Sequence, residues 1–332
     1  MIKTNQYMRI AIVRLSAMGD IIQSMIVLQF IKEYIPNATI DWFVDEKFSD
    51  ILKGAKYLDN IFPIQIKGVK LHKVTFRLIN LYKFLRNKGK YDLVIDLQGL
   101  IKSAIVARFI QAKRRVGFDR KSSREPLSAI FYSESYRIPY EKNVIRRYIG
   151  LLEQCLDIKI PDNKILEKES FFLIKKKNLD DYIVFVIGAS FASKIYPIEK
   201  FAEVSNSLVE DVVVVWHSDQ EEILAQKLKK LSPQVDISKK FNFDELKNLI
   251  YNASLVIGGD TGPTHLAWGL NTPSITLFGS TPMKRNFMKT KINYALDSNS
   301  EVDPFRINKS DYSIKNIHPS KILDLYKQIT QI

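Results

Sequence analysis

The sequence predicts an α/β protein with two doubly wound domains. Strand and helix signals alternate through the first half of the chain, and a polar, charged segment from about Pro161 to Asp181 interrupts them. The same alternation then begins again. A length of 332 residues fits about two domains. Because each strand signal is followed by a helix signal, we expect parallel sheets with helices on both faces.

In the first half, short apolar runs predict buried strands, and longer amphipathic stretches predict helices. The expected strands are residues 9–14, 39–44 and 93–96, and the expected helices are residues 25–34, 76–87 and 101–110. The first of these helices should end before Pro36, because a residue that precedes proline disfavours helical geometry.

In the second half the same signals return in the same order. The expected strands are residues 182–187, 212–216, 255–257 and 274–278, and the expected helices are residues 198–209, 221–231, 243–252 and 320–329. We therefore predict an N-terminal domain over residues 1–165 and a C-terminal domain over 175–320. Residues 321–332 form a terminal helix that could pack back on the N-terminal domain. The carboxyl ends of the strands should hold ligands, so we expect the active site in the cleft between the domains.

Positive charge is concentrated in the first half of the chain. Residues 1–160 carry 28 basic and 15 acidic side chains, whereas residues 161–332 carry 22 and 21. The overall net charge is +14. The first domain should therefore face an anionic partner, which could be nucleic acid, an acidic membrane surface or a polyanionic substrate.

Cysteine, histidine and hydropathy narrow the class of protein further. The single cysteine, Cys155, fits a reducing cytoplasm and lies in an amphipathic helix pattern, where we expect it in the core. Four histidines and one cysteine form no cluster with metal-ligand spacing, so we expect no metal and no cofactor. The N-terminus lacks a signal-peptide pattern, and no run of about 18 apolar residues predicts a membrane span.

The most informative motif is the stretch Gly258-Gly259-Asp260-Thr261-Gly262-Pro263-Thr264-His265, which follows a strand signal and precedes a helix signal. Glycines allow a tight turn and a close approach of ligand. The free N–H groups and the dipole of the following helix favour an anion such as a diphosphate. Asp260 could also bind hydroxyls of a sugar that the diphosphate carries. The alternative is a capped helix behind a buried strand.

Polar residues also follow the strands of the first half. Asp20, in Ser16-Ala17-Met18-Gly19-Asp20, is either a general base or a helix cap. Lys102 belongs to Asp96-Leu97-Gln98-Gly99-Leu100-Ile101-Lys102-Ser103-Ala104, which could also be an ordinary capped helix. A basic set could bind phosphate or carboxylate oxygens, and its members are Lys113, Arg114, Arg115, Arg120, Lys121 and Arg124.

Two loops of the second half complete the candidates. Ser190 and Lys194, in a small-residue loop over residues 188–197, could hold a diphosphate, and Lys194 could neutralise charge on a departing phosphate. A carboxylate after the strand at 212–216 could bind ribose hydroxyls, and Glu221 and Glu222 both stand there. For His217 we favour a structural role.

Together these motifs resemble those of the lipopolysaccharide heptosyltransferases of glycosyltransferase family 9, and among them heptosyltransferase I. The resemblance runs from about residue 8 to the C-terminus, and its matching pieces are residues 9–20, 96–104, 124–127 and 260–266. It implies a GT-B fold and an inverting, metal-independent transfer of heptose. The implied donor is ADP-L-glycero-β-D-manno-heptose, and the implied acceptor is the inner 3-deoxy-octulosonic acid (Kdo) of Kdo2-lipid A.

The resemblance also implies a role for each matching residue. Asp20 would be the general base, and Lys194 with the helix start at Thr261 and Gly262 would stabilise the departing ADP. Asp260 would hold heptose hydroxyls. The remaining donor-side residues are Ser190 and His265 near the diphosphate, Glu221 at the ribose and Phe241 near the adenine.

The acceptor implied by this family would explain the basic first domain. Kdo2-lipid A is anionic and lies in the inner leaflet of the cytoplasmic membrane, so we expect a cytoplasmic protein that binds this anionic membrane surface peripherally. Its basic contacts would include Arg77, Lys102, Arg120 and Arg124. Heptosyltransferase II is an alternative. A nucleic-acid-binding protein is an alternative from another class, but no recognition motif supports it. A nicotinamide enzyme would need a G-x-G-x-x-G turn, which is absent.

Overall fold

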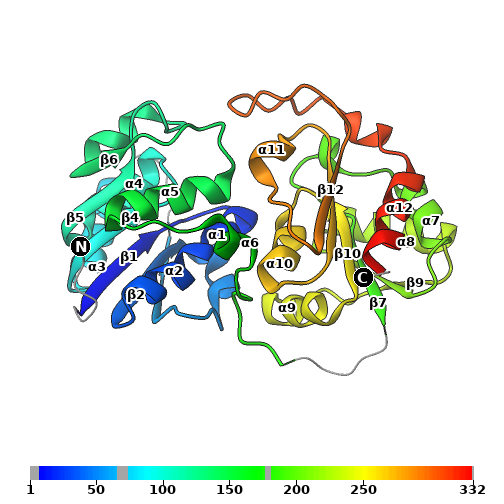
Figure 1. Cartoon of the computed structure of the whole chain (residues 1–332), viewed down its shortest axis with the longest axis horizontal. Coiled ribbons are helices and arrows are strands. Elements are labelled where there is room, and N and C mark those ends of the chain that lie inside the picture. The colour runs from blue at the N-terminus through cyan, green and yellow to red at the C-terminus, as the bar shows by residue number, and fades with distance from the viewer. Residues whose placement is uncertain (1–6, 66–73, 176–180, 331–332) are drawn as a thin grey trace. The chain divides into compact units, whose positions relative to one another are not determined.

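The computed structural model describes residues 7–65, 74–175 and 181–330, and it divides the chain into two compact units, Met1–Lys168 and Glu169–Ile332. Each unit is an α/β domain with one parallel sheet (Figure 1). The fold class predicted from the alternating strand and helix signals is therefore confirmed within each unit.

The first unit contains a sheet with the strand order β3-β2-β1-β4-β5-β6. Its strands are β1 (Met8–Val13), β2 (Ala38–Asp45), β3 (Asn60–Ile64), β4 (Lys90–Asp96), β5 (Gln111–Phe118) and β6 (Glu134–Tyr136). Its helices are α1 (Met18–Ser24), α2 (Ile26–Tyr34), α3 (Val74–Arg86), α4 (Ile101–Phe109), α5 (Val144–Leu156) and α6 (Asp162–Leu166), with the 3-10 helices η1 (Glu46–Leu52) and η3 (Pro126–Phe131). This order is that of a dinucleotide-binding sheet, which reverses its direction of growth between β1 and β4.

Helices cover both faces of the first sheet. On one face α1 and α2 pack against α5, and on the other α4 packs against both α3 and η3. Right-handed crossovers produce this arrangement, because helices before and after the reversal must lie on opposite faces. Cys155 lies on the buried side of α5 and is 3% exposed, which confirms its place in the core.

The second unit repeats the first topology, with the strand order β12-β11-β10-β7-β8-β9. Its strands are β7 (Tyr182–Val186), β8 (Asp211–Val215), β9 (Val235–Ile237), β10 (Leu255–Gly259), β11 (Ser274–Phe278) and β12 (Asn293–Asp297). Its helices are α7 (Ile198–Ser205), α8 (Asp219–Leu231), α9 (Phe243–Asn252), α10 (Gly262–Leu270), α11 (Met283–Asn286) and α12 (Pro319–Thr330), with the 3-10 helices η4 (Ala192–Lys194) and η5 (Ser313–Asn316). Here the reversal falls between β7 and β10.

Two further segments are described by the structure. The terminal helix α12 lies beside α7, where Ile322 joins the hydrophobic core of the second unit (Figure 1). The expected linker contains defined contacts. It begins with α6, and Phe171 packs its ring 5.4 Å from that of Trp268 while its N–H donates to the Gly269 carbonyl.

Candidate active site

The predicted site residues gather at the carboxyl edges of the two sheets. In the first unit Asp20 follows β1, Lys102 follows β4, and Arg120 and Arg124 follow β5. In the second unit the donor-side residues all follow β7, β8, β9 or β10, and they are Ser190, Lys194, Glu221, Phe241, Asp260, Thr261, Gly262 and His265. Loops at such an edge, next to the reversal, form the ligand site of a doubly wound sheet. Each unit therefore carries its own group of candidate site residues at the carboxyl edge of its sheet.

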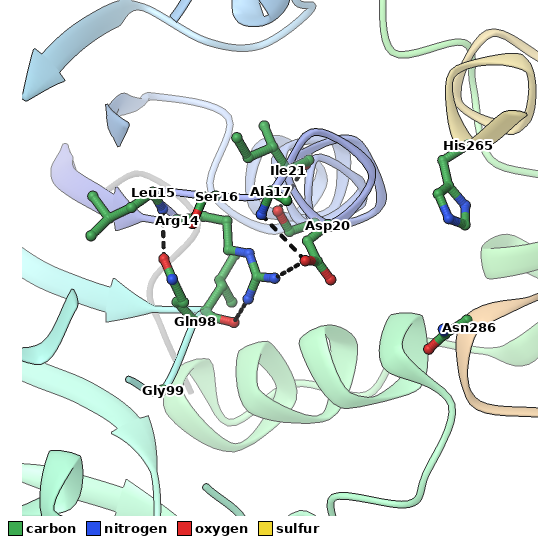
Figure 2. Close-up of polar contacts among 12 residues, drawn as sticks. Arg14, Leu15, Ser16, Ala17, Asp20, Ile21, Gln98, Gly99, His265 and Asn286 are labelled. Atoms are coloured by element: carbon green, nitrogen blue, oxygen red, sulfur yellow. Dashed lines mark hydrogen bonds and ion pairs between the residues drawn. The ribbon is translucent and has the colours of Figure 1, made fainter. Parts of the chain in front are cut away.

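Asp20 lies in the first turn of α1 and not at its N-cap, which is Ala17. Its Oδ2 accepts a hydrogen bond from the Ala17 N–H at 3.3 Å and pairs with Nη2 of Arg14 at 2.9 Å. Figure 2 shows the side chains of Arg14 and Asp20 pointing toward each other. The Asp20 side chain remains 41% exposed, whereas that of Arg14 is 8% exposed. The carboxylate is thus fixed in orientation and open to an incoming group.

Arg14 is a site residue to which sequence reasoning assigned no role. It follows β1 directly, and its Nη1 donates to the Leu97 carbonyl at 3.0 Å. Burial acts to lower the pKa of Arg14, but the charge of Asp20, with smaller contributions from Tyr148 and Asp96, outweighs this and raises it. The guanidinium therefore stays charged. A basic residue directly after the buried apolar run over residues 10–13 was the available signal, because burial of a charge requires a partner.

The loop after β4 is tied to the loop after β1. The Leu15 N–H donates to Oε1 of Gln98 at 2.8 Å, and Nζ of Lys102 donates to Oγ of Ser16 at 3.1 Å (Figure 2 shows the Leu15 contact). Lys102 is thereby held beside the Asp20 loop.

Asp96 has a structural role in this loop. Its carboxylate is fully buried and accepts hydrogen bonds from the N–H groups of Gln98 and Gly99 and from the Tyr132 hydroxyl. Burial raises the pKa of Asp96. Gly99 has a φ of 68°, a conformation that favours glycine.

The basic set after α4 separates into two groups. Arg120 and Arg124 are exposed beyond the end of β5, where they were expected. The residues at positions 113–115 lie inside β5 itself. Lys113 pairs with Asp92 at 2.8 Å, and Arg114 binds both carboxylate oxygens of Glu134 at 2.7 Å. Lys113 and Arg114 therefore form ion pairs within the unit, and their binding of phosphate or carboxylate oxygens stays a prediction. Arg77 lies outside the described side chains.

In the second unit, Asp260 is the centre of a buried polar network. Its side chain is 6% exposed, with Oδ1 2.9 Å from Nε2 of His265 and Oδ2 3.4 Å from Nζ of Lys194. Nδ2 of Asn286 also donates to Oδ2 at 3.1 Å. Burial acts to raise the pKa of Asp260, but the charge of Lys194 and the hydrogen bond from His265 hold it well below its usual range. The carboxylate therefore stays ionised and fixes the Lys194 ammonium.

The start of α10 offers backbone donors beside this network. Thr261 is its N-cap but makes no side-chain capping bond, and Pro263 stands in the first turn. The hydroxyl of Thr264 donates to the Gly259 carbonyl at 2.6 Å. Because Thr261 does not cap the helix through its side chain, the N–H groups of the first turn, except at Pro263, which has none, can face another acceptor. A Cβ on Gly258 would approach Cβ of Val186 to 2.6 Å, so glycine permits the close pairing of β10 with β7. This geometry suits a bound anion.

Glu221 and Glu222 point to different surroundings. Oε2 of Glu221 accepts from the His217 N–H at 2.7 Å, and a Cβ on Gly188 would lie only 2.1 Å from its Oε1. Its carboxylate therefore lies against the loop after β7, at the carboxyl edge. Glu222 lines a surface groove on α8 with Asp219 and Lys230. Glu221 also completes the capping box of α8 with Ser218, and its role at the ribose stays a prediction. His217 contributes its backbone here, which agrees with a structural role.

Phe241 and Ser190 complete the donor side. Phe241 lies in the loop after β9 and is partly buried, with Nζ of Lys239 5.9 Å from its ring centroid. Ser190 is exposed in the loop after β7, and Lys194 follows it in η4. Within the described ranges, no group of three or more histidine, cysteine or acidic residues could hold a metal ion. No helix in the described part of the chain is both long and apolar enough to cross a membrane.

Comparison with known proteins identifies the family. The profile of glycosyltransferase family 9 (heptosyltransferase) matches residues 78–301. The lipopolysaccharide heptosyltransferase 1 of Campylobacter coli is 36% identical over 97% of this chain and 99% of its own length. The chain belongs to glycosyltransferase family 9. The corresponding protein of Pseudomonas aeruginosa is 28% identical over 82% of this chain and 79% of its own length.

Solved structures confirm the GT-B fold expected for a family 9 glycosyltransferase. The Escherichia coli heptosyltransferase WaaC with ADP matches with a TM-score of 0.81 and 24% identity, over 97% of this chain and all of that one. The Escherichia coli heptosyltransferase II matches with a TM-score of 0.77 and 18% identity, over 98% and 99% of the two chains. The enzyme class inferred from the motifs, a glycosyltransferase, is confirmed by the family profile and by the Campylobacter coli relative.

Proposed function

We propose that this family 9 glycosyltransferase transfers L-glycero-D-manno-heptose from ADP-L-glycero-β-D-manno-heptose to the inner Kdo of Kdo2-lipid A, in lipopolysaccharide core biosynthesis. Relatives that match 97% and 82% of this chain are named lipopolysaccharide heptosyltransferase 1. The observation that carries the proposal is the exposed Asp20 carboxylate, held by Arg14 at the carboxyl edge of the first sheet. A transferase that activates a hydroxyl needs such a base.

On the acceptor side, Asp20 would remove the proton from the attacking Kdo hydroxyl. The freed oxygen forms a bond to the anomeric carbon of heptose while the bond from that carbon to the diphosphate oxygen breaks on the opposite face. This single displacement inverts the anomeric configuration and leaves the proton on Asp20. Arg14 orients the carboxylate throughout, because its own position is fixed by the Leu97 carbonyl.

On the donor side, the departing ADP gains negative charge without the help of a metal ion. The ammonium of Lys194 and the N–H groups at Thr261 and Gly262 would stabilise that charge. Asp260 keeps Lys194 in place, and His265 and Ser190 would contact the diphosphate. Asp260 has both carboxylate oxygens engaged within its own unit, so a contact with heptose hydroxyls would use their remaining lone pairs.

The nucleotide would lie across the ends of β8 and β9. Glu221 would accept hydrogen bonds from the ribose hydroxyls, as an acidic residue at this edge of a doubly wound sheet does in dinucleotide-binding proteins. Phe241 would contact the adenine. The acceptor, which carries phosphates and carboxylates, would bind Lys102, Arg120 and Arg124. Such an acceptor would place the enzyme at the inner face of the cytoplasmic membrane as a peripheral protein.

The decisive experiment measures ADP release from ADP-heptose, with and without Kdo2-lipid A or its deacylated form, in the presence of a chelator. We expect release that requires the acceptor and continues in chelator, and an inverted anomeric configuration in the product by NMR. Release only with an already heptosylated acceptor would assign the chain to heptosyltransferase II instead. Release that stops in chelator would contradict the metal-independent mechanism.

A further inference from the structure

Helix α3 presents large apolar side chains to solvent. Leu78, Ile79, Tyr82 and Phe84 are 42%, 47%, 40% and 36% exposed, while Leu85 is fully buried in the core beneath the helix. A surface helix of a globular domain normally carries polar residues on its outer side. A cluster of exposed apolar side chains on one element instead marks an interaction surface.

A second exposed apolar element lies in the same layer. Leu127 and Ile130 of η3 are 63% and 57% exposed. Both α3 and η3 pack against α4, so they cover the same face of the first sheet. The Tyr82 ring meets Phe109, at the end of α4, with a centroid distance of 5.4 Å. We call the surface formed by Leu78, Ile79, Tyr82, Leu127 and Ile130 the α3–η3 face.

Basic residues border the α3–η3 face. Residues 78–90 contain four basic residues and no acidic one, and Arg120, Lys121 and Arg124 precede η3. Neither Lys83 nor Arg86 has an ion pair with a carboxylate in the described part of the chain. Burial and the nearby charges of Arg108 and Arg86 lower the pKa of Arg115. Positive charge on this layer is therefore concentrated and uncompensated.

The α3–η3 face adjoins the acceptor half of the candidate site. The Ser128 hydroxyl of η3 donates to the Gly99 carbonyl at 3.4 Å, and Glu125, just before η3, accepts the Ile101 N–H at 2.7 Å. Gly99 and Ile101 belong to the same loop and helix start as Lys102. A surface bound at η3 would thus lie next to the loop that holds Lys102 beside Ser16.

We propose that the α3–η3 face docks on the anionic surface of a lipid bilayer. Its apolar side chains would enter the headgroup region, and Lys83, Arg86 and Arg124 would contact lipid phosphates. Exposed apolar residues bordered by basic ones are the pattern of an interfacial membrane element, and neither component alone gives stable attachment. The inference deepens the proposed function, because a lipid-linked acceptor would then be presented beside its own binding loop.

The test measures co-sedimentation of the full chain with phosphatidylcholine vesicles, with and without added phosphatidylglycerol. We expect binding to the anionic vesicles that weakens as salt rises. The double variants Leu78→Ser/Ile79→Ser and Leu127→Ser/Ile130→Ser should each lower the partition coefficient about tenfold or more. The matched control, Val209→Ser/Ile223→Ser, replaces two exposed apolar residues of the second unit and should bind like the wild type.

Thermal unfolding of each variant checks that the fold is intact, which the exposure of all these side chains leads us to expect. Binding to anionic vesicles that both α3–η3 variants retain would overturn the proposal, and so would failure of the wild type to bind. That failure would point instead to a protein partner for this face. ADP release with a deacylated, water-soluble acceptor separates the two proposals. Normal ADP release without vesicle binding would contradict only the docking proposal. Vesicle binding without ADP release would contradict only the proposed reaction.

Discussion

Lys194 and Asp260 form a nearly buried ion pair, with Nζ 3.4 Å from Oδ2 and side chains 12% and 6% exposed. His265 and Asn286 bind the same carboxylate. The ammonium that we assign to the departing diphosphate is therefore held in position before any ligand binds. Such preorganised charge is effective because the protein does not have to reorient at the moment of reaction.

The Asp260 carboxylate should make stability depend on pH in the acid range. Because its pKa is lowered in the folded protein, Asp260 contributes stability that is fully present above its unfolded pKa of about 3.9. That contribution is lost progressively as the pH falls below this value toward the folded pKa. In urea unfolding, the free-energy difference between wild type and Asp260→Asn should narrow as the pH falls below about pH 4. Asp236→Asn, at an exposed pair with Lys229, is the control and should show no such change.

Replacing Lys194 should affect both stability and turnover. Lys194→Met leaves Asp260 buried without its cation, and loss of one partner of a buried pair costs about 3–5 kcal/mol. The double variant Lys194→Met/Asp260→Asn should lose less unfolding free energy than the two single variants lose in sum. A double-mutant cycle should measure this difference as about 1–3 kcal/mol. Strict additivity would contradict the pairing. At saturating donor, kcat of Lys194→Met should fall about 100-fold.

Asp20→Asn should reduce turnover by at least about 100-fold, because the amide cannot accept the acceptor proton. ADP affinity, measured by calorimetry, should stay at the wild-type value, since Asp20 belongs to the first unit and the donor-side residues to the second. Asp50→Asn, another exposed carboxylate of the first unit, is the control and should turn over normally. A nearly active Asp20→Asn would remove Asp20 from the role of general base.

Adjacent glutamates on α8 give a matched pair for the nucleotide site. Glu221→Gln should weaken ADP binding about tenfold, the usual loss for a hydrogen bond to a charged group. Glu222→Gln should bind ADP normally, because Glu222 faces the surface groove. The reverse result in calorimetry would move the ribose contact to Glu222.

Much of the fold could be predicted because most of its strands are continuous apolar runs. Helix α9 and strand β11 have the expected bounds. Strand β5 was missed because it contains the consecutive basic residues 113–115, which interrupt the apolar pattern of a buried strand. Strands β6 and β9 have three residues each, too few for any periodicity.

The candidate site could be predicted where a motif follows a strand, as at Asp20, Lys194 and Asp260. The contacts that hold these residues in place could not be predicted from the sequence. Asn286 reaches Asp260 only because the loop after β11 lies beside the loop after β10, a relation set by strand order and not by spacing along the chain. The ion pairs that Lys113 and Arg114 form with Asp92 and Glu134 also depend on neighbours that only the folded sheet supplies.

Both units have the same strand order, and this repetition bears on how substrate choice is divided along the chain. Every residue that we assign to the donor follows a strand of the second sheet, and every residue that we assign to the acceptor follows a strand of the first. If these assignments hold, donor choice and acceptor choice are encoded in separate stretches of the gene. A hybrid chain spliced between Lys168 and Glu169 should inherit its sugar nucleotide from one parent and the molecule it decorates from the other.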